Sequence, residues 1–114
     1  MKNLLDETIL DLRMHQKELS DVLYVMYAPS PFVKERRMMK FKCDAEILNA
    51  ILNFNYDDGY GSTVINDGLI LRGADFWLER HEYDGSEWWE YKQLPALDEY
   101  EDVDVSDIRI KNRF

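Results

Sequence analysis

The dipeptide Asp84-Gly85 constrains the fold most, because it joins two runs with strand composition, Phe76–Tyr83 and Ser86–Lys92. Asp-Gly favours a two-residue hairpin turn, and such a turn fixes how the flanking strands pair. The predicted pairs, from the turn outward, are Tyr83 with Ser86, Glu82 with Glu87, His81 with Trp88, Arg80 with Trp89, Glu79 with Glu90 and Leu78 with Tyr91.

Side chains alternate between the two faces of a strand. One face of the hairpin is predicted to point to the core, with Phe76, Leu78, Arg80, Trp89 and Tyr91. The other face mixes indole rings with carboxylates, namely Trp77, Glu79, His81, Tyr83, Trp88 and Glu90. Like charges directly opposite each other destabilise a strand pair, so the acids are expected either on ordinary solvated surface or on a patch that meets basic groups.

Local patterns predict the remaining elements. Two helices are expected: an amphipathic helix over residues 3–19 capped by Asn3, and a helix Ala45–Phe54 capped by Asp44. The buried side of the second helix is predicted to hold Ile47, Leu48, Ile51, Leu52 and Phe54. Strands are expected over 22–28, over 38–43 with Met39, Phe41 and Cys43 on one face, and over 63–66 and 69–72. The expected fold class is α+β, with two helices packed on an antiparallel sheet and the hairpin 76–92 at its centre.

Length and composition suit one globular domain. The chain has 114 residues, of which 46% are hydrophobic, a level that excludes a disordered protein. Residues 1–97 are expected to form the single α+β domain, and 98–114 an acidic C-terminal segment of the kind that is often mobile. No apolar run approaches the roughly 20 residues of a membrane helix. The acidic N-terminus does not resemble a signal peptide, so a cytoplasmic location is expected.

Charge is unevenly distributed along the chain. Residues 1–43 hold 8 Lys/Arg against 6 Asp/Glu, whereas residues 44–114 hold 6 against 17, giving a net charge of −9. Such acidity can simply keep a small protein soluble. It also repels nucleic acid and attracts the basic grooves with which other proteins hold nucleic acid.

Few residues suggest catalysis or metal binding. Cys43 is the only cysteine, and its spacing from His15 and His81 does not indicate a nucleophile–base pair. Asp57-Asp58-Gly59 is too short for a calcium loop, and His81-Glu82 lacks a second histidine at helical spacing. We therefore expect no enzyme activity, no metal, no cofactor and no direct nucleic-acid binding, although a short basic cluster at 34–42 is present.

The remaining interpretation is a protein that imitates nucleic acid. Carboxylates on a rigid sheet can occupy arginine and lysine sites that normally hold phosphates, and tryptophans can anchor the contact. The predicted partner-binding residues are Asp57, Asp58, Trp77, Glu79, Glu82, Glu87, Trp88, Glu90, Asp98, Glu99, Glu101 and Asp102. This chemistry fits an inhibitor of a nucleic-acid enzyme and equally an immunity protein or antitoxin against a nuclease toxin, or another regulatory protein that binds a basic host protein.

Two segments, Asn55-Tyr56-Asp57-Asp58-Gly59-Tyr60-Gly61 and the run from Trp77 to Lys92, resemble a family of small acidic proteins of unknown function from phages and prophages of Gram-positive bacteria. The resemblance covers about two-thirds of the chain and carries no catalytic motif. It implies a phage or mobile-element origin and a place of action in the host bacterial cell. Small phage proteins often inhibit host defence, so the resemblance suggests an anti-CRISPR protein that binds a type II RNA-guided Cas nuclease.

Overall fold

The computed structural model describes residues 1–27, 39–57 and 68–96, together with residues 98, 101, 102, 104 and 106. Its elements in chain order are β1 (Lys2–Asn3), α1 (Leu4–Met14), the short 3-10 helix η1 (Leu19–Asp21), β2 (Tyr24–Tyr27), β3 (Met39–Lys42), α2 (Ala45–Leu52), β4 (Asn55–Tyr56), β5 (Ile70–Arg72), β6 (Phe76–Tyr83) and β7 (Ser86–Gln93). The predicted strand over residues 63–66 lies outside the described residues.

The first helix begins as predicted and ends earlier than predicted. The side-chain oxygen of Asn3 accepts a hydrogen bond of 3.0 Å from the backbone N–H of Asp6, which caps the helix start. At the other end Gln16 takes a left-handed backbone conformation, with φ 58°. The N–H of Lys17 then donates to the carbonyl of Leu12 at 2.9 Å. This closing turn ends the helix at Met14 rather than at residue 19.

The second helix is capped as predicted, because Asp44 accepts a hydrogen bond of 2.9 Å from the N–H of Ile47. Leu48 and Leu52 are buried against the core. The prediction that Ile47, Ile51 and Phe54 are buried with them was wrong, since all three are exposed. Residues 48 and 52 form a narrow stripe on this helix, whereas 47 and 51 lie about 100° around its axis from that stripe.

The main sheet is antiparallel throughout, with the strand order β3-β2-β5-β6-β7. The register of the hairpin is confirmed pair by pair, from Tyr83 opposite Ser86 to Leu78 opposite Tyr91. Asp84 and Gly85 both have positive φ, 51° and 85°. These angles match the turn type that Asp-Gly favours, whose twist suits the flanking strands.

The hairpin lies at one end of the sheet, so the expectation that it would be central was wrong. Only residues 73–75 separate β5 from β6, and this short connection places β5 directly beside β6. After β7 the chain leaves through Leu94 and Pro95. Within the described ranges no strand pairs with the outer edge of β7.

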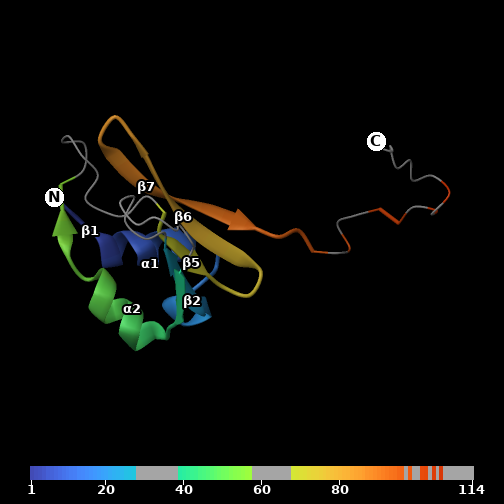
Figure 1. Cartoon of the computed structure of the whole chain (residues 1–114), viewed down its shortest axis with the longest axis horizontal. Coiled ribbons are helices and arrows are strands. Elements are labelled where there is room, and N and C mark those ends of the chain that lie inside the picture. Colours follow the sequence, from blue (N-terminus) through green and yellow to red (C-terminus); the bar gives the residue numbers. More distant parts are fainter. Residues whose placement is uncertain are drawn as a thin grey trace.

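A second, two-stranded sheet was not predicted. It pairs β1 with β4, with Lys2 opposite Tyr56 and Asn3 opposite Asn55, and it ties the N-terminus to the segment after α2 (Figure 1). The side-chain amide of Asn3 also donates to the side chains of Asn53 and Asn55, each at 3.1 Å. Strands of two residues carry too little sequence pattern to be recognised.

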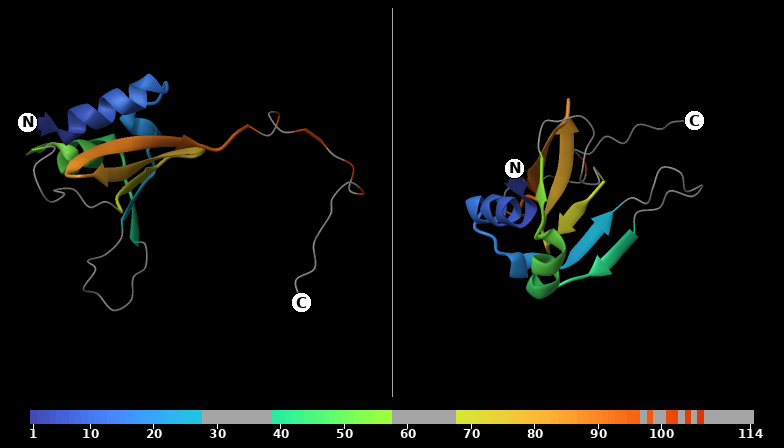
Figure 2. Two further views of the ribbon diagram at one scale, coloured as in Figure 1. Left: turned by 90° about the horizontal axis from the view of Figure 1, so that it is seen from above. Right: turned by 90° about the vertical axis from the view of Figure 1, so that its left-hand side faces the viewer.

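Both helices lie on the same side of the main sheet (Figure 2). The core between these layers includes Val25, Leu71, Leu78 and Phe76 from the sheet and Leu12 from α1. The α+β fold with two helices on an antiparallel sheet is therefore confirmed. None of the helices in the described ranges has the length and apolar character needed to cross a membrane.

Candidate partner-binding face

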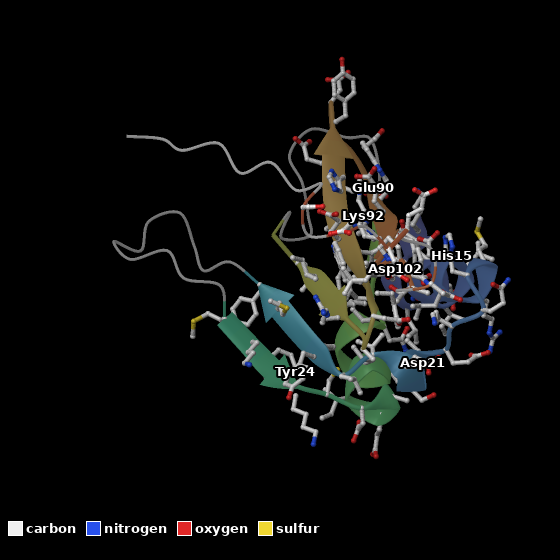
Figure 3. All side chains as sticks on the ribbon, turned by 90° about the vertical axis from the view of Figure 1, so that its right-hand side faces the viewer. His15, Asp21, Tyr24, Glu90, Lys92 and Asp102 are labelled. Atoms are coloured by element: carbon white, nitrogen blue, oxygen red, sulfur yellow. The ribbon has the colours of Figure 1, made fainter. Side chains whose placement is uncertain are left out.

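The side of the hairpin that faces away from the helices presents aromatic and charged residues. We call this surface the hairpin face. Strand alternation and the observed register place on it Trp77, Glu79, His81 and Tyr83 from β6 and Ser86, Trp88, Glu90 and Lys92 from β7. Figure 3 labels Glu90 and Lys92 on the hairpin and His15 on α1, which packs against the other side of the sheet.

At the centre of the hairpin face, Glu79 and Glu90 lie directly opposite each other. Nε2 of His81 lies 2.6 Å from Oε2 of Glu90 and 3.3 Å from Oε2 of Glu79. Both contacts are ion pairs when the imidazole is protonated. Among the described residues no acceptor meets hydrogen-bond geometry at this nitrogen. Nζ of Lys92 lies 4.0 Å from Oε1 of Glu79. Basic neighbours thus offset the repulsion that two facing carboxylates would otherwise suffer.

Two tryptophans flank this acidic pair. Trp88 is 37% exposed, and its ring stacks near that of His81 with centroids 6.3 Å apart. Trp77 is half-buried, and the guanidinium of Arg72 lies 5.6 Å from its ring centroid. Large aromatic rings that are both positioned and accessible are the residue type that dominates binding energy in protein interfaces.

Behind the hairpin face, a buried polar network anchors the hairpin to the helices. Arg80 is 3% exposed and donates from Nη2 to the hydroxyl of Tyr56 at 2.6 Å. That hydroxyl donates to Oε2 of Glu7 at 2.6 Å, and Nη1 of Arg80 lies 3.3 Å from Oε1 of Glu7. The guanidinium also lies over the rings of Tyr56 and Trp89, 5.4 and 4.9 Å from their centroids.

Further contacts reinforce this attachment along β7. The indole N–H of Trp89 donates to the Thr8 hydroxyl at 2.9 Å, and that hydroxyl donates to the Leu4 carbonyl at 2.7 Å. The ring of Tyr91 stacks on His15 of α1, with centroids 3.8 Å apart. Since β7 is held by residues of α1 over two helical turns, the hairpin face is a rigid surface rather than a loose flap.

Burial within the network shifts two pKa values. Burial, and then the hydrogen bond to Glu7, raise the pKa of the Tyr56 hydroxyl, which therefore stays protonated and remains a donor. Burial also raises the pKa of Asp11, and the nearby Glu7 carboxylate raises it further, while Arg80 opposes the change.

The structure brings four of the predicted binding residues together on the hairpin face. They are Trp77, Glu79, Trp88 and Glu90. Glu82 and Glu87 face each other on the opposite, helix-side face of the hairpin. Glu82 is exposed there, whereas Glu87 is only 1% exposed.

The other predicted binding residues that the structure describes lie away from the hairpin face. Asp57 follows β4 and is exposed. The described acids of the C-terminal segment, Asp98, Glu101 and Asp102, are also exposed. Asp58 and Glu99 lie outside the described residues.

His81 and Lys92 were not among the predicted binding residues, although the predicted register already contained the signal. That register put His81 diagonal to Glu90 and on the same face as Glu79. A basic side chain beside two facing acids is expected to pair with them. The acids were predicted to bind another molecule, whereas in the structure they also contact His81 and Lys92 of the same hairpin.

Cys43 is buried, and its sulfur lies 3.7 Å from the carbonyl oxygen of Val22. Burial raises the pKa of this thiol, and the Asp44 carboxylate raises it further, so the reactive thiolate is disfavoured. No group of three or more metal-binding side chains suited to a metal ion occurs among the described residues.

No family model, curated protein or solved structure matches this chain. The resemblance to small phage proteins therefore stays a prediction from the sequence.

Proposed function

We propose that this protein is a stoichiometric inhibitor that binds another protein through the hairpin face. The observation that carries the proposal is that Trp77 and Trp88 flank the facing acids Glu79 and Glu90 on a sheet surface that neither helix covers. Aromatic residues at the centre of a patch with polar groups around them are typical of protein interfaces.

Charge supports a basic partner. The chain holds 14 Lys and Arg against 23 Asp and Glu, a formal net charge of −9 at pH 7. In the described part of the chain one cation, Arg80, and one acid, Glu87, are buried, so the surface keeps this acidic balance. A protein with a basic groove for nucleic acid is the partner class that this field attracts most strongly.

Within this class we propose a bacterial defence nuclease, in particular a type II RNA-guided Cas nuclease. The resemblance to phage proteins supports this narrower identity, and the charge supports the mode of action. The hairpin face and the exposed acids of the C-terminal segment would occupy part of the groove that holds nucleic acid. Loading of DNA would then be blocked without any chemical reaction.

The proposal requires the acids of the hairpin face to exchange partners on binding. Glu79 and Glu90 now contact His81 and Lys92. A bidentate arginine of the partner can replace these contacts, because paired guanidinium–carboxylate bonds are stronger than the exposed ion pairs observed here. The tryptophans would then supply most of the binding energy, while the acids would orient the two proteins and raise the rate of association.

A binding experiment tests this function. The protein is immobilised, and association with a purified type II effector loaded with guide RNA is followed as the salt concentration rises from about 0.05 M to about 0.5 M. The association rate should fall steeply, and target DNA added first should prevent binding. Trp88→Ala should weaken the affinity at least about tenfold, and Glu79→Gln with Glu90→Gln should mainly slow association.

Matched controls lie on the helix side of the molecule. Met14→Ala removes an apolar side chain that is 65% exposed on α1, and Asp6→Asn with Glu46→Gln removes two exposed acids. Both variants should bind like the parent. An association rate that does not change with salt, or equal losses in the control variants, would contradict binding through the hairpin face.

A further inference from the structure

The edge strand β3, at the end of the sheet opposite the hairpin, leaves one side open for pairing. All four of its residues, Met39–Lys42, are exposed, and within the described ranges β2 is its only strand partner. Met39 and Phe41 share the helix side of the sheet with Val25 and are 47% and 39% exposed. Lys40 and Lys42 therefore point to the opposite side.

The backbone of β3 is arranged to accept another strand. The N–H of Cys43 donates to the carbonyl of Leu23 in the neighbouring chain segment at 3.0 Å. Because hydrogen-bonded and non-bonded positions alternate in an antiparallel ladder, residues 41 and 39 also point their backbone groups toward β2. The N–H and C=O groups of Lys40 and Lys42 consequently point outward, and such an edge is a ready template for a further strand.

The C-terminal segment contains a sequence that complements this edge. Residues 102–105 read Asp-Val-Asp-Val, whereas β3 reads Met-Lys-Phe-Lys. Paired antiparallel, Asp102 meets Lys42 and Asp104 meets Lys40 on one side, while the two valines cover Phe41 and Met39 on the other. Opposite charges and apolar pairs directly across a ladder both stabilise it.

The aspartates of this segment are available. Asp102 and Asp104 are exposed, and the chain beyond β7 leads away from the sheet (Figure 1). Hydrogen bonds from the backbone and hydroxyl of Ser106 lower the pKa of Asp104, which therefore remains a carboxylate over a wide pH range.

We infer that residues 102–105 of one copy of this protein add as an antiparallel strand to the open edge of β3 in a second copy. The exchange is reciprocal, so two copies form a closed dimer with two identical contacts. This inference does not depend on the hairpin face, because β3 lies at the opposite end of the sheet, but it shares the acids of the C-terminal segment with the function proposed above.

The length of the connecting segment favours a second copy over the chain's own β3. Residues 94–101 join β7 to Asp102, and nine residue steps span at most about 30 Å when fully extended. A strand beyond β3 lies five inter-strand spacings from β7, about 24 Å across a flat sheet and farther across a twisted one. The segment would be nearly taut within one chain, a situation that favours exchange between copies.

The test measures the mass of the full-length protein by sedimentation equilibrium, at about 0.15 M salt and up to about 1 mM protein, where a contact of even about −4 kcal/mol becomes visible. The mass should rise from 13.6 kDa toward twice that value. Lys40→Glu with Lys42→Glu, and separately Asp102→Lys with Asp104→Lys, should each weaken association at least about tenfold. The variant with all four changes should associate again to within about threefold of the parent, because the charges complement each other once more.

The matched control is Asp98→Lys with Glu101→Lys, which alters the charge of the same segment outside the proposed pairing and should leave association unchanged. A monomer at every concentration would overturn the inference, as would a tail bound within one chain. Failure of the four-residue variant to recover would show that these lysines and aspartates do not pair, and equal loss in the control would show a general charge effect. Either result would also overturn the inference.

Discussion

Arg80 shows how one residue connects the core to the hairpin face. The alternation of β6 places it among buried side chains, where an unpaired cation would cost several kcal/mol. Glu7 and Tyr56 supply the compensating contacts. The sequence alone placed Arg80 correctly on the core face, but its partners are distant in the chain and carry no local signal. The buried network therefore could not be predicted.

Removing only one partner of this pair should be costly. Arg80→Met leaves Glu7 without its cation and should lower the free energy of unfolding by about 3–5 kcal/mol. Arg80→Met combined with Glu7→Gln should cost less than the sum of the two single changes, because both charges are then gone. Urea denaturation followed by circular dichroism measures all three variants. Additive losses would show that the ion pair does not couple Arg80 to Glu7.

Asp11 should make stability depend on pH. Burial and the Glu7 carboxylate raise the pKa of Asp11 in the folded protein. The contribution of Asp11 to folding stability is therefore favourable below the pKa it has in the unfolded chain, and is lost as the pH rises through its pKa in the folded protein. Asp11→Asn should therefore be more stable than the parent at pH 7, and the difference should shrink as the pH falls toward about 4. Chemical denaturation at both pH values measures this. A difference that stays constant with pH would contradict the assignment.

At the scale of elements, local chemistry determined what could be predicted. The Asp84-Gly85 turn and the caps at Asn3 and Asp44 depend on residues close together in sequence, and all three were confirmed. The end of α1 depends on a left-handed Gln16, which no residue preference indicates. The order of the strands depends on contacts between distant segments, so the position of the hairpin at the sheet end was not foreseen.

The turn between β5 and β6 should be intolerant of side chains. A Cβ atom at Gly73 would lie 2.1 Å from Cε1 of Phe76, and Phe76 is itself buried. Gly73→Ala should lower the free energy of unfolding by about 1–3 kcal/mol through overpacking. The same change should cost less in a Phe76→Leu background, which leaves more room. Equal losses in the two backgrounds, measured by urea denaturation, would place the strain elsewhere.

At the scale of the whole molecule, the fold separates two acidic surfaces of the hairpin that the list of predicted binding residues combined. Acidic residues were predicted to act together, yet the sheet places Glu79 and Glu90 on the hairpin face and Glu82 and Glu87 on the helix side. The register predicted this sorting correctly. Burial of Glu87 could not be predicted, because it depends on how the layers pack. What the sequence did indicate is an exposed tryptophan beside carboxylates on a rigid strand pair.

The most direct test of the central proposal is a DNA-cleavage assay with a purified type II effector and guide RNA, into which this protein is titrated before the DNA. The proposal predicts that cleavage is lost near one equivalent and that Trp88→Ala shifts the titration to higher concentration, whereas Met14→Ala does not. Undiminished cleavage at a large excess of the protein, across a panel of such effectors, would contradict the proposed inhibition of these nucleases.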